Sequence, residues 1–137
     1  MRVVMDTNVV LAALLVKILD GEFITNYTTE EALYELSIKM GILAEKGKLS
    51  EDWKRILARY LKGSVVVPSF ETFNFSRDPD DNKWLGIAYK AKAEYILTWD
   101  KDLLELRGDN KTLSLGTHVV MILKPIEFYH EVLKAEC

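Results

Sequence analysis

The sequence predicts an α/β fold in three layers, in which a central parallel sheet lies between two layers of helices. Short apolar runs alternate along the chain with longer segments whose apolar residues recur at helical spacing, and this alternation is typical of a parallel sheet with right-handed crossovers. Of the 137 residues, 49% are hydrophobic and 28% are charged, which suffices for the core of one domain of ordinary size. We therefore expect residues 1–137 to form a single domain.

The first half of the chain is expected to contain three strands and three helices. In chain order they are strand 2–5, helix 8–19, strand 23–26, a long helix from residue 30, helix 50–62 and strand 64–67. Thr28 or Thr29 can cap the long helix. Strand 64–67 is rich in β-branched residues and is expected to be covered on both faces. The expected buried face of helix 50–62 consists of Trp53, Ile56, Leu57, Tyr60 and Leu61.

The second half is expected to add two strands to the sheet. In chain order its elements are helix 79–92, strand 94–99, a short helix 100–106, a turn-rich loop 107–115, strand 117–123 and a closing helix 125–133. Pro79 and Pro125 each suit the first position of a helix, because the N–H that proline lacks would have no partner within the helix at that position.

Acidic residues follow the ends of two predicted strands. Asp6 follows the first strand and Asp100 follows the fourth, and these are the two central strands if the sheet has the doubly wound order 3-2-1-4-5. In such sheets, ligands bind at the carboxyl ends of the strands. Asp81 lies at the start of helix 79–92, and Glu35 lies beside the buried stripe of the long helix. We therefore expect four carboxylates to converge at this edge.

Each of these acids also has a simpler structural explanation, because helix N-termini favour acidic side chains. Asp78 before Pro79 is suited to an N-cap, and Asp6 and Asp100 are suited to caps of the helices that follow them. Capping explains neither the placement of acids after the first and fourth strands nor Glu35 in the middle of a helix.

The other residue types leave oxygen as the only candidate metal ligand. Cys137 is the single cysteine, so a thiolate cluster for zinc is excluded, and His118 and His130 are isolated in the sequence. Carboxylate and water oxygens suit Mg²⁺ or Mn²⁺. The longest apolar run, residues 9–16, is too short to cross a bilayer, and no signal peptide is visible. A cytoplasmic protein without a membrane partner is expected.

The net charge is -3, but basic residues are concentrated between Glu45 and Lys62. Two interpretations of this segment remain open, an ordinary solvated helix face and a surface that contacts RNA phosphates. The candidates for RNA contact on the outward side of helix 50–62 are Lys54, Arg55, Arg59 and Lys62, and Arg77 is a further candidate.

Five short motifs occur in order along the chain: MDTNVV at 5–10, YEL at 34–36, RDPDDN at 77–82, LTWDKDLL at 97–104 and MILKPIEF at 121–128. Together they resemble the PIN domains of VapC-like toxins and related ribonucleases. The resemblance implies the PIN-like α/β/α fold with sheet order 3-2-1-4-5 and an endoribonuclease that depends on Mg²⁺ or Mn²⁺. The first crossover, residues 15–22, is shorter than such relatives lead us to expect.

The resemblance also implies roles for individual residues. The acidic quartet that holds the metal falls on Asp6, Glu35, Asp81 and Asp100. The accessory residues are Asp78 and Asp102, with Thr7, Asn8 and Thr98 as supporting polar groups.

Partners follow partly from the family and partly from the long helix. The family implies RNA as substrate, an antitoxin protein as a possible partner, and frequent dimers. A second apolar set on the long helix, Tyr34, Ile38 and Ile42, fits a homodimer or antitoxin interface, or burial within the same chain. The alternative function is a non-catalytic PIN-fold module that binds RNA or protein without cleavage.

Overall fold

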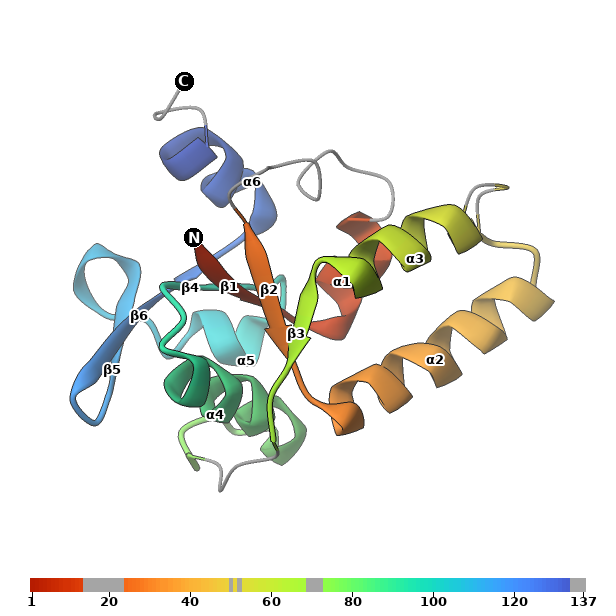
Figure 1. The fold of residues 1–137 in the computed structure, drawn as a ribbon. Helices are drawn as coiled ribbons and strands as arrows, with labels where there is room; N and C mark the ends of the chain where they lie inside the picture. Colours follow the sequence, from red (N-terminus) through yellow and green to blue (C-terminus); the bar gives the residue numbers. More distant parts are fainter. Residues whose placement is uncertain (14–23, 50, 52, 69–72, 134–137) are drawn as a thin grey trace.

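The computed structural model describes residues 1–13, 24–49, 51, 53–68 and 73–133, and the fold is shown in Figure 1. These residues form a six-stranded sheet of order β3-β2-β1-β4-β6-β5. The strands are β1 (Arg2–Met5), β2 (Thr25–Thr28), β3 (Ser64–Val66), β4 (Tyr95–Leu97), β5 (Thr112–Leu115) and β6 (His118–Leu123). The five strands from β3 to β6 in this order are parallel, which confirms the expected 3-2-1-4-5 arrangement with β6 as its fifth strand.

Helices cover both faces of the sheet. They are α1 (Thr7–Ala13), α2 (Glu30–Glu45), α3 (Trp53–Lys62), α4 (Asn82–Ala91), α5 (Lys101–Leu104) and α6 (Pro125–Phe128). Along β1, Val3 and Met5 point into a core formed with α1, α2, α3 and α6, whereas Val4 points into a second core formed mainly with α4 and α5. This alternation follows from the two-residue period of a strand. The three expected layers are therefore confirmed.

Thr29 and Asp78 cap the helical segments that follow them, as expected from the sequence. The Thr29 side chain accepts a hydrogen bond from the N–H of Ala32, and Glu30 and Glu31 complete the first turn of α2. A 3₁₀ turn, Pro79–Asp81, precedes α4, and Asp78 caps it by accepting from the N–H of Asp80. These local contacts place the N-termini of both helices next to the carboxyl edge of the sheet.

Strand β2 begins two residues later than the expected strand 23–26. The pairing of Arg2 with Thr25 and of Val3 with Asn26 sets its register on β1. Asn26 is buried in the sheet because its amide accepts from the N–H of Met5 at 3.2 Å and donates to the hydroxyl of Tyr60 at 2.9 Å. Asn26 therefore lies inside β2 and is tolerated there because both the oxygen and the nitrogen of its amide have partners.

Strand β3 is not covered on both faces, and this expectation was wrong. It ends the sheet order and pairs with β2. Val65 and Val66 are 42% and 49% exposed. On α3, Tyr60 is buried, but Leu61 is 45% exposed, so Leu61 does not belong to the expected buried face. The apolar β-branched run at 64–67 therefore forms a strand at the edge of the described sheet instead of a central strand.

The region expected as a loop, residues 107–115, contains the additional strand β5. It pairs antiparallel with β6, and Gly116 takes a positive φ of 63° in the turn between them. The closing helix also differs from expectation, because α6 is followed by a π-helical segment, Tyr129–Leu133. The turn residues at positions 108–111 led us to expect a loop, and β5, which follows them, has only four residues.

Some expectations concern residues outside the described ranges. These are the end of helix 8–19, the start of strand 23–26, the first residue of helix 50–62 and the short first crossover 15–22. Within the described ranges, no helix combines the length and the apolar character needed to cross a membrane.

Candidate active site

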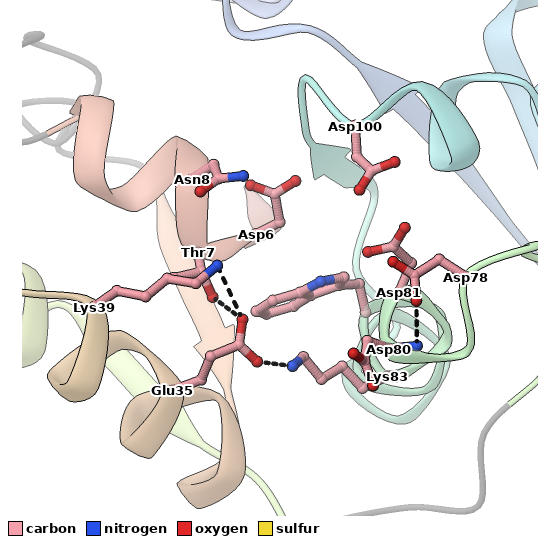
Figure 2. A pocket seen from close by; sticks show the side chains of 11 residues that line it. Asp6, Thr7, Asn8, Glu35, Lys39, Asp78, Asp80, Asp81, Lys83 and Asp100 are labelled. Carbon is pink, nitrogen blue, oxygen red and sulfur yellow. Dashed lines mark hydrogen bonds and ion pairs between the residues drawn. The ribbon is translucent and has the colours of Figure 1, made fainter.

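A pocket of about 420 Å³ opens beside the ends of β1 and β4, and Figure 2 shows the side chains around it. Seven residues singled out from the sequence line it: Asp6, Thr7, Asn8, Glu35, Asp78, Asp81 and Asp100. Four further residues line it that were not assigned to the site: Lys39, Asp80, Lys83 and Trp84. The chain thus brings all four acids of the expected quartet to one cavity from α2, from the 3₁₀ turn before α4 and from two strand ends.

Asp6 lies directly after β1 and is only 5% exposed. Its Oδ1 accepts from the N–H of Val9 at 2.9 Å, as a cap of α1 does, and its Oδ2 accepts from the hydroxyl of Thr98. Burial raises the pKa of Asp6 above its ordinary value, while the hydrogen bonds from Thr98 and Val9 oppose that increase. The carboxylate is therefore held in one orientation toward the pocket.

Thr98 joins the two strand ends that carry Asp6 and Asp100. It is fully buried, and its hydroxyl accepts from the N–H of Asp100 at 2.9 Å while it donates to Asp6. Asp100 in turn accepts from the N–H of Asp102 at 2.8 Å and caps α5. Capping thus accounts for one oxygen each of Asp6 and Asp100, and it leaves Asp81 to be explained.

Asp81 has no such cap contact. It is 8% exposed, and its Oδ2 is buried without a hydrogen-bond partner in the described part of the chain. Burial, a hydrogen bond with Asp100 and the charges of Asp100, Asp78 and Asp102 raise its pKa to about 7. Carboxylate oxygens of Asp78, Asp81 and Asp102 lie within 4.8 Å of one another.

This aspartate cluster fits a divalent cation by its donor chemistry. An unpartnered buried carboxylate oxygen is costly in a protein, and a bound cation would satisfy it. All of the surrounding donors are carboxylates, which suit Mg²⁺ or Mn²⁺.

Glu35 lies across the pocket from Asp78, Asp81 and Asp100 (Figure 2). It forms an ion pair with Lys83, accepts from the hydroxyl of Thr7 at 3.0 Å, and lies 3.6 Å from the Nζ of Lys39. Burial by itself would raise the pKa of Glu35, but the hydrogen bond and charge of Lys83, with Thr7 and Lys39, lower it overall. Glu35 is therefore held by two lysines and Thr7, whereas Asp81, at the same cavity, is surrounded by other aspartates.

Comparison with known proteins identifies the family. A family model described as PIN domain matches residues 2–102, which include β1 to β4 and the whole pocket. The chain belongs to the PIN-domain family. It is 37% identical over 141 residues to a protein of Methanocaldococcus jannaschii described only as uncharacterized, and the match covers 95% of this chain and 90% of that protein.

Membership of the PIN-domain family indicates a nuclease-type function. In this PIN domain, the expected accessory residues are distributed around the acids. Thr7 supports Glu35, Thr98 supports Asp6, Asn8 is exposed at the pocket, and Asp102 joins Asp78 and Asp81.

The basic residues of α3 do not line the pocket of the PIN domain. Among Lys54, Arg55, Arg59 and Lys62, Arg59 instead borders a small cavity with Ile24 and Gly63 near the start of β2. Arg77 is closer to the acids, because it pairs with Glu105 and lies 3.7 Å from Asp102. A role of the α3 residues in RNA binding remains a prediction.

The two lysines of the pocket were not assigned to the acidic site from the sequence. Lys39 follows Glu35 by four residues on α2, a spacing that places both on one face, so this pair was predictable. Lys83 is 48 residues from Glu35 and reaches it only because α4 packs beside the sheet edge. Trp84, an apolar residue of helix 79–92, is buried and also borders the cavity.

Proposed function

We propose that this PIN domain is an endoribonuclease that depends on Mg²⁺ or Mn²⁺ and hydrolyses phosphodiester bonds in RNA. One observation carries the proposal: the buried, unpartnered Oδ2 of Asp81 within a group of aspartates at the edge of the sheet. The neighbouring aspartates repel one another and Asp81 Oδ2 has no partner in the described part of the chain, so a bound cation would relieve the repulsion and satisfy that oxygen.

Four acids form the proposed metal site: Asp6, Glu35, Asp81 and Asp100. Asp78 and Asp102 are proposed as accessory acids, because each has an oxygen within reach of Asp81. When bound, the cation supplies an activated water and stabilises the charge on the leaving oxygen.

The chain itself contributes orientation to the proposed reaction. Thr98 holds the carboxylate of Asp6, and the N–H of Val9 holds its other oxygen. On the other side of the cavity, the hydroxyl of Thr7 donates to the carboxylate of Glu35 and orients it. Such partners of metal ligands keep them in one geometry and reduce the reorganisation needed when substrate arrives.

We further propose that the protein is the toxin component of a toxin–antitoxin pair and that it forms a homodimer through α2. Tyr34, Ile38 and Ile42 on this helix are 69%, 46% and 47% exposed. A surface helix of a monomer does not need a second apolar stripe, so these side chains are suited to contact another protein surface. The same stripe is the candidate surface for an antitoxin.

The decisive experiment incubates the protein with a mixed pool of tRNA, rRNA and mRNA in the presence of Mg²⁺, Mn²⁺ or a chelator. We expect cleavage with either metal and none with chelator. Asp6→Asn and Asp100→Asn should abolish cleavage while the fold is kept, because each removes a ligand charge at nearly constant volume. Asp109→Asn, on the exposed turn before β5, is the matched control and should cleave at the parent rate.

The alternative is a PIN-fold module that binds RNA or protein without cleaving it. Calorimetric titration with Mn²⁺ separates the two, because a catalytic site should bind the ion and lose it in Asp81→Asn. RNA binding by the parent with neither heat of metal binding nor cleavage would favour the non-catalytic module.

A further inference from the structure

The pocket has two chemically different sides. Asp6, Asp78, Asp81 and Asp100 line one side, and on the other side Lys39 and Lys83 both pair with Glu35, with Asp80 beside Lys83 in Figure 2. Figure 2 shows both lysines directed toward Glu35 from different helices. Lys39 and Lys83 are therefore the cations among the described residues that line the pocket, and both lie away from Asp81 and Asp100.

Lys83 is held tightly in this position. Its side chain is only 13% exposed, its Nζ pairs with Glu35, and it lies 5.1 Å from the centre of the Trp84 ring. Lys39 is more open, with 43% of its side chain exposed. An ammonium group has three N–H donors, so Lys83 can keep its ion pair with Glu35 and still donate to a second anion in the cavity.

Trp84 adds an independent observation. The residue is 4% exposed and borders the same cavity. Within the described part of the chain, its indole N–H donates no hydrogen bond. Because this nitrogen is not among the buried atoms without a partner, the N–H is reached from the cavity and can donate to an acceptor on a bound ligand.

An RNA phosphate matches these three donors. It is a compact anion with several acceptor oxygens, and it must approach the aspartates for hydrolysis to occur. We propose that Lys39, Lys83 and the indole N–H of Trp84 bind a phosphate group of the RNA substrate on the side of the pocket opposite the aspartates. Glu35 then acts, besides its proposed place in the quartet, as a positioning residue that holds both lysines at the cavity before substrate binds. This inference rests on the proposed ribonuclease function.

The test measures binding of a fluorescein-labelled single-stranded RNA by anisotropy, in chelator so that no metal-dependent cleavage occurs, over a range of salt concentrations. Lys39→Met and Lys83→Met should each weaken binding about three- to tenfold and reduce the slope of log affinity against log salt by about 0.7, the value for one lost phosphate contact on a single strand. Trp84→Phe should weaken binding without changing the slope, because it removes a neutral donor. In the presence of Mn²⁺, the lysine variants should raise KM and bind the ion at least as tightly as the parent does.

Matched controls come from the same chain. Lys90→Met changes a lysine about two turns further along α4 and should keep the parent affinity and slope. Trp53→Phe is the control for Trp84→Phe, because Trp53 does not line the pocket, and it should keep the parent affinity. Lys39 lies on the more open side of the site, so Lys39→Met tests the inference even if Lys83→Met folds poorly.

The outcomes separate the two proposals. If the parent cleaves RNA and both lysine variants keep the parent slope and KM, the phosphate site is refuted and the ribonuclease stands. If the lysine variants lose slope as expected but no RNA is cleaved with either metal, the phosphate site stands and the ribonuclease is refuted.

Discussion

The hydroxyl of Thr98, at the end of β4, donates a hydrogen bond to the carboxylate of Asp6, at the end of β1. Because the same hydroxyl accepts from the N–H of Asp100, one buried side chain sets the relative position of two acids that are 94 residues apart in the chain. We expect Thr98→Val to lower kcat/KM for RNA about tenfold, since removing an outer partner of a metal ligand typically costs 10- to 100-fold.

Valine has nearly the volume of threonine, so the fold of Thr98→Val should survive, as circular dichroism would show. Thr117→Val, in the exposed turn before β6, is the control and should leave kcat/KM unchanged. Parent kinetics in Thr98→Val would show that the strand ends orient the acids without this hydroxyl.

Asp81 should make the stability of the metal-free protein depend on pH. Its folded pKa is about 7, above the ordinary 3.8, so the folded state holds a proton more tightly than the unfolded state. The contribution of Asp81 to the stability of the metal-free protein should therefore be greatest below about pH 4. This contribution should be lost as the pH rises toward 7. In Asp81→Asn this loss should disappear, with a gain of roughly 2 kcal/mol at pH 8 over the metal-free parent.

Urea unfolding in chelator at several pH values measures this effect, and added Mn²⁺ should raise the parent's stability more at pH 8 than at pH 5. Asp109→Asn, with an exposed acid away from the pocket, should retain the parent's pH dependence. A flat difference between parent and Asp81→Asn from pH 5 to pH 8 would contradict the raised pKa.

Glu127 should have the opposite pH dependence. Burial by itself raises its pKa, but contacts from Lys111 at 2.8 Å, the N–H of Lys124 and Arg107 at 2.9 Å lower it to about 2. The stability that this carboxylate contributes is present above about pH 4.5 and is lost as the pH falls toward 2. We expect Glu127→Gln to cost roughly 1 to 2 kcal/mol at pH 7 and almost nothing near pH 2.

Thermal unfolding across this pH range checks the prediction for Glu127. Glu131→Gln is the control, since Glu131 is more exposed and shares only Lys111 with the cluster, so its loss should be smaller. Equal losses in both variants would show that Lys111 provides the stabilisation, without a contribution from Arg107 or the N–H of Lys124.

The basic residues of α3 are predicted to guide RNA toward a site that is otherwise strongly acidic. Arg55→Ala combined with Arg59→Ala should weaken binding equally for different RNA sequences and flatten the log–log salt dependence by roughly 2, at about 0.7 to 0.9 per phosphate contact. Metal affinity measured by calorimetry should stay at the parent value. An unchanged salt slope would assign these arginines to ordinary solvation and leave Arg77, Lys83 and Lys101 as the next candidates.

Self-association through α2 is predicted from its exposed apolar stripe. Ile38→Asp should shift the protein from dimer to monomer in sedimentation velocity, because a charge would be buried in the interface. Ile126→Asp, at another exposed isoleucine on α6, should sediment as the parent does. A parent that sediments as a monomer at high concentration would reject a homodimer through this face.

The sequence by itself determined the features that depend on neighbouring residues. Helical spacing and a capping threonine predicted α2, and a helix of this kind forms wherever its apolar stripe finds a core. The placement of Asp6 and Asp100 after apolar strands was equally visible, because parallel strands bring their carboxyl ends to one edge. The PIN-domain resemblance rested on these local motifs, and the family match confirms it.

Only the tertiary structure decided what depends on the packing of distant segments. The same β-branched pattern suits a central strand and an edge strand, so the exposure of Val66 followed from the position of β3 in the sheet order. Asn26 could enter a buried strand because Tyr60 and Met5 satisfy its amide. The pairing of Lys83 with Glu35, and the unpartnered oxygen of Asp81, likewise arise where α2, α4 and two strand ends meet. Periodicity describes one element at a time, whereas burial and charge pairing are properties of several elements packed together.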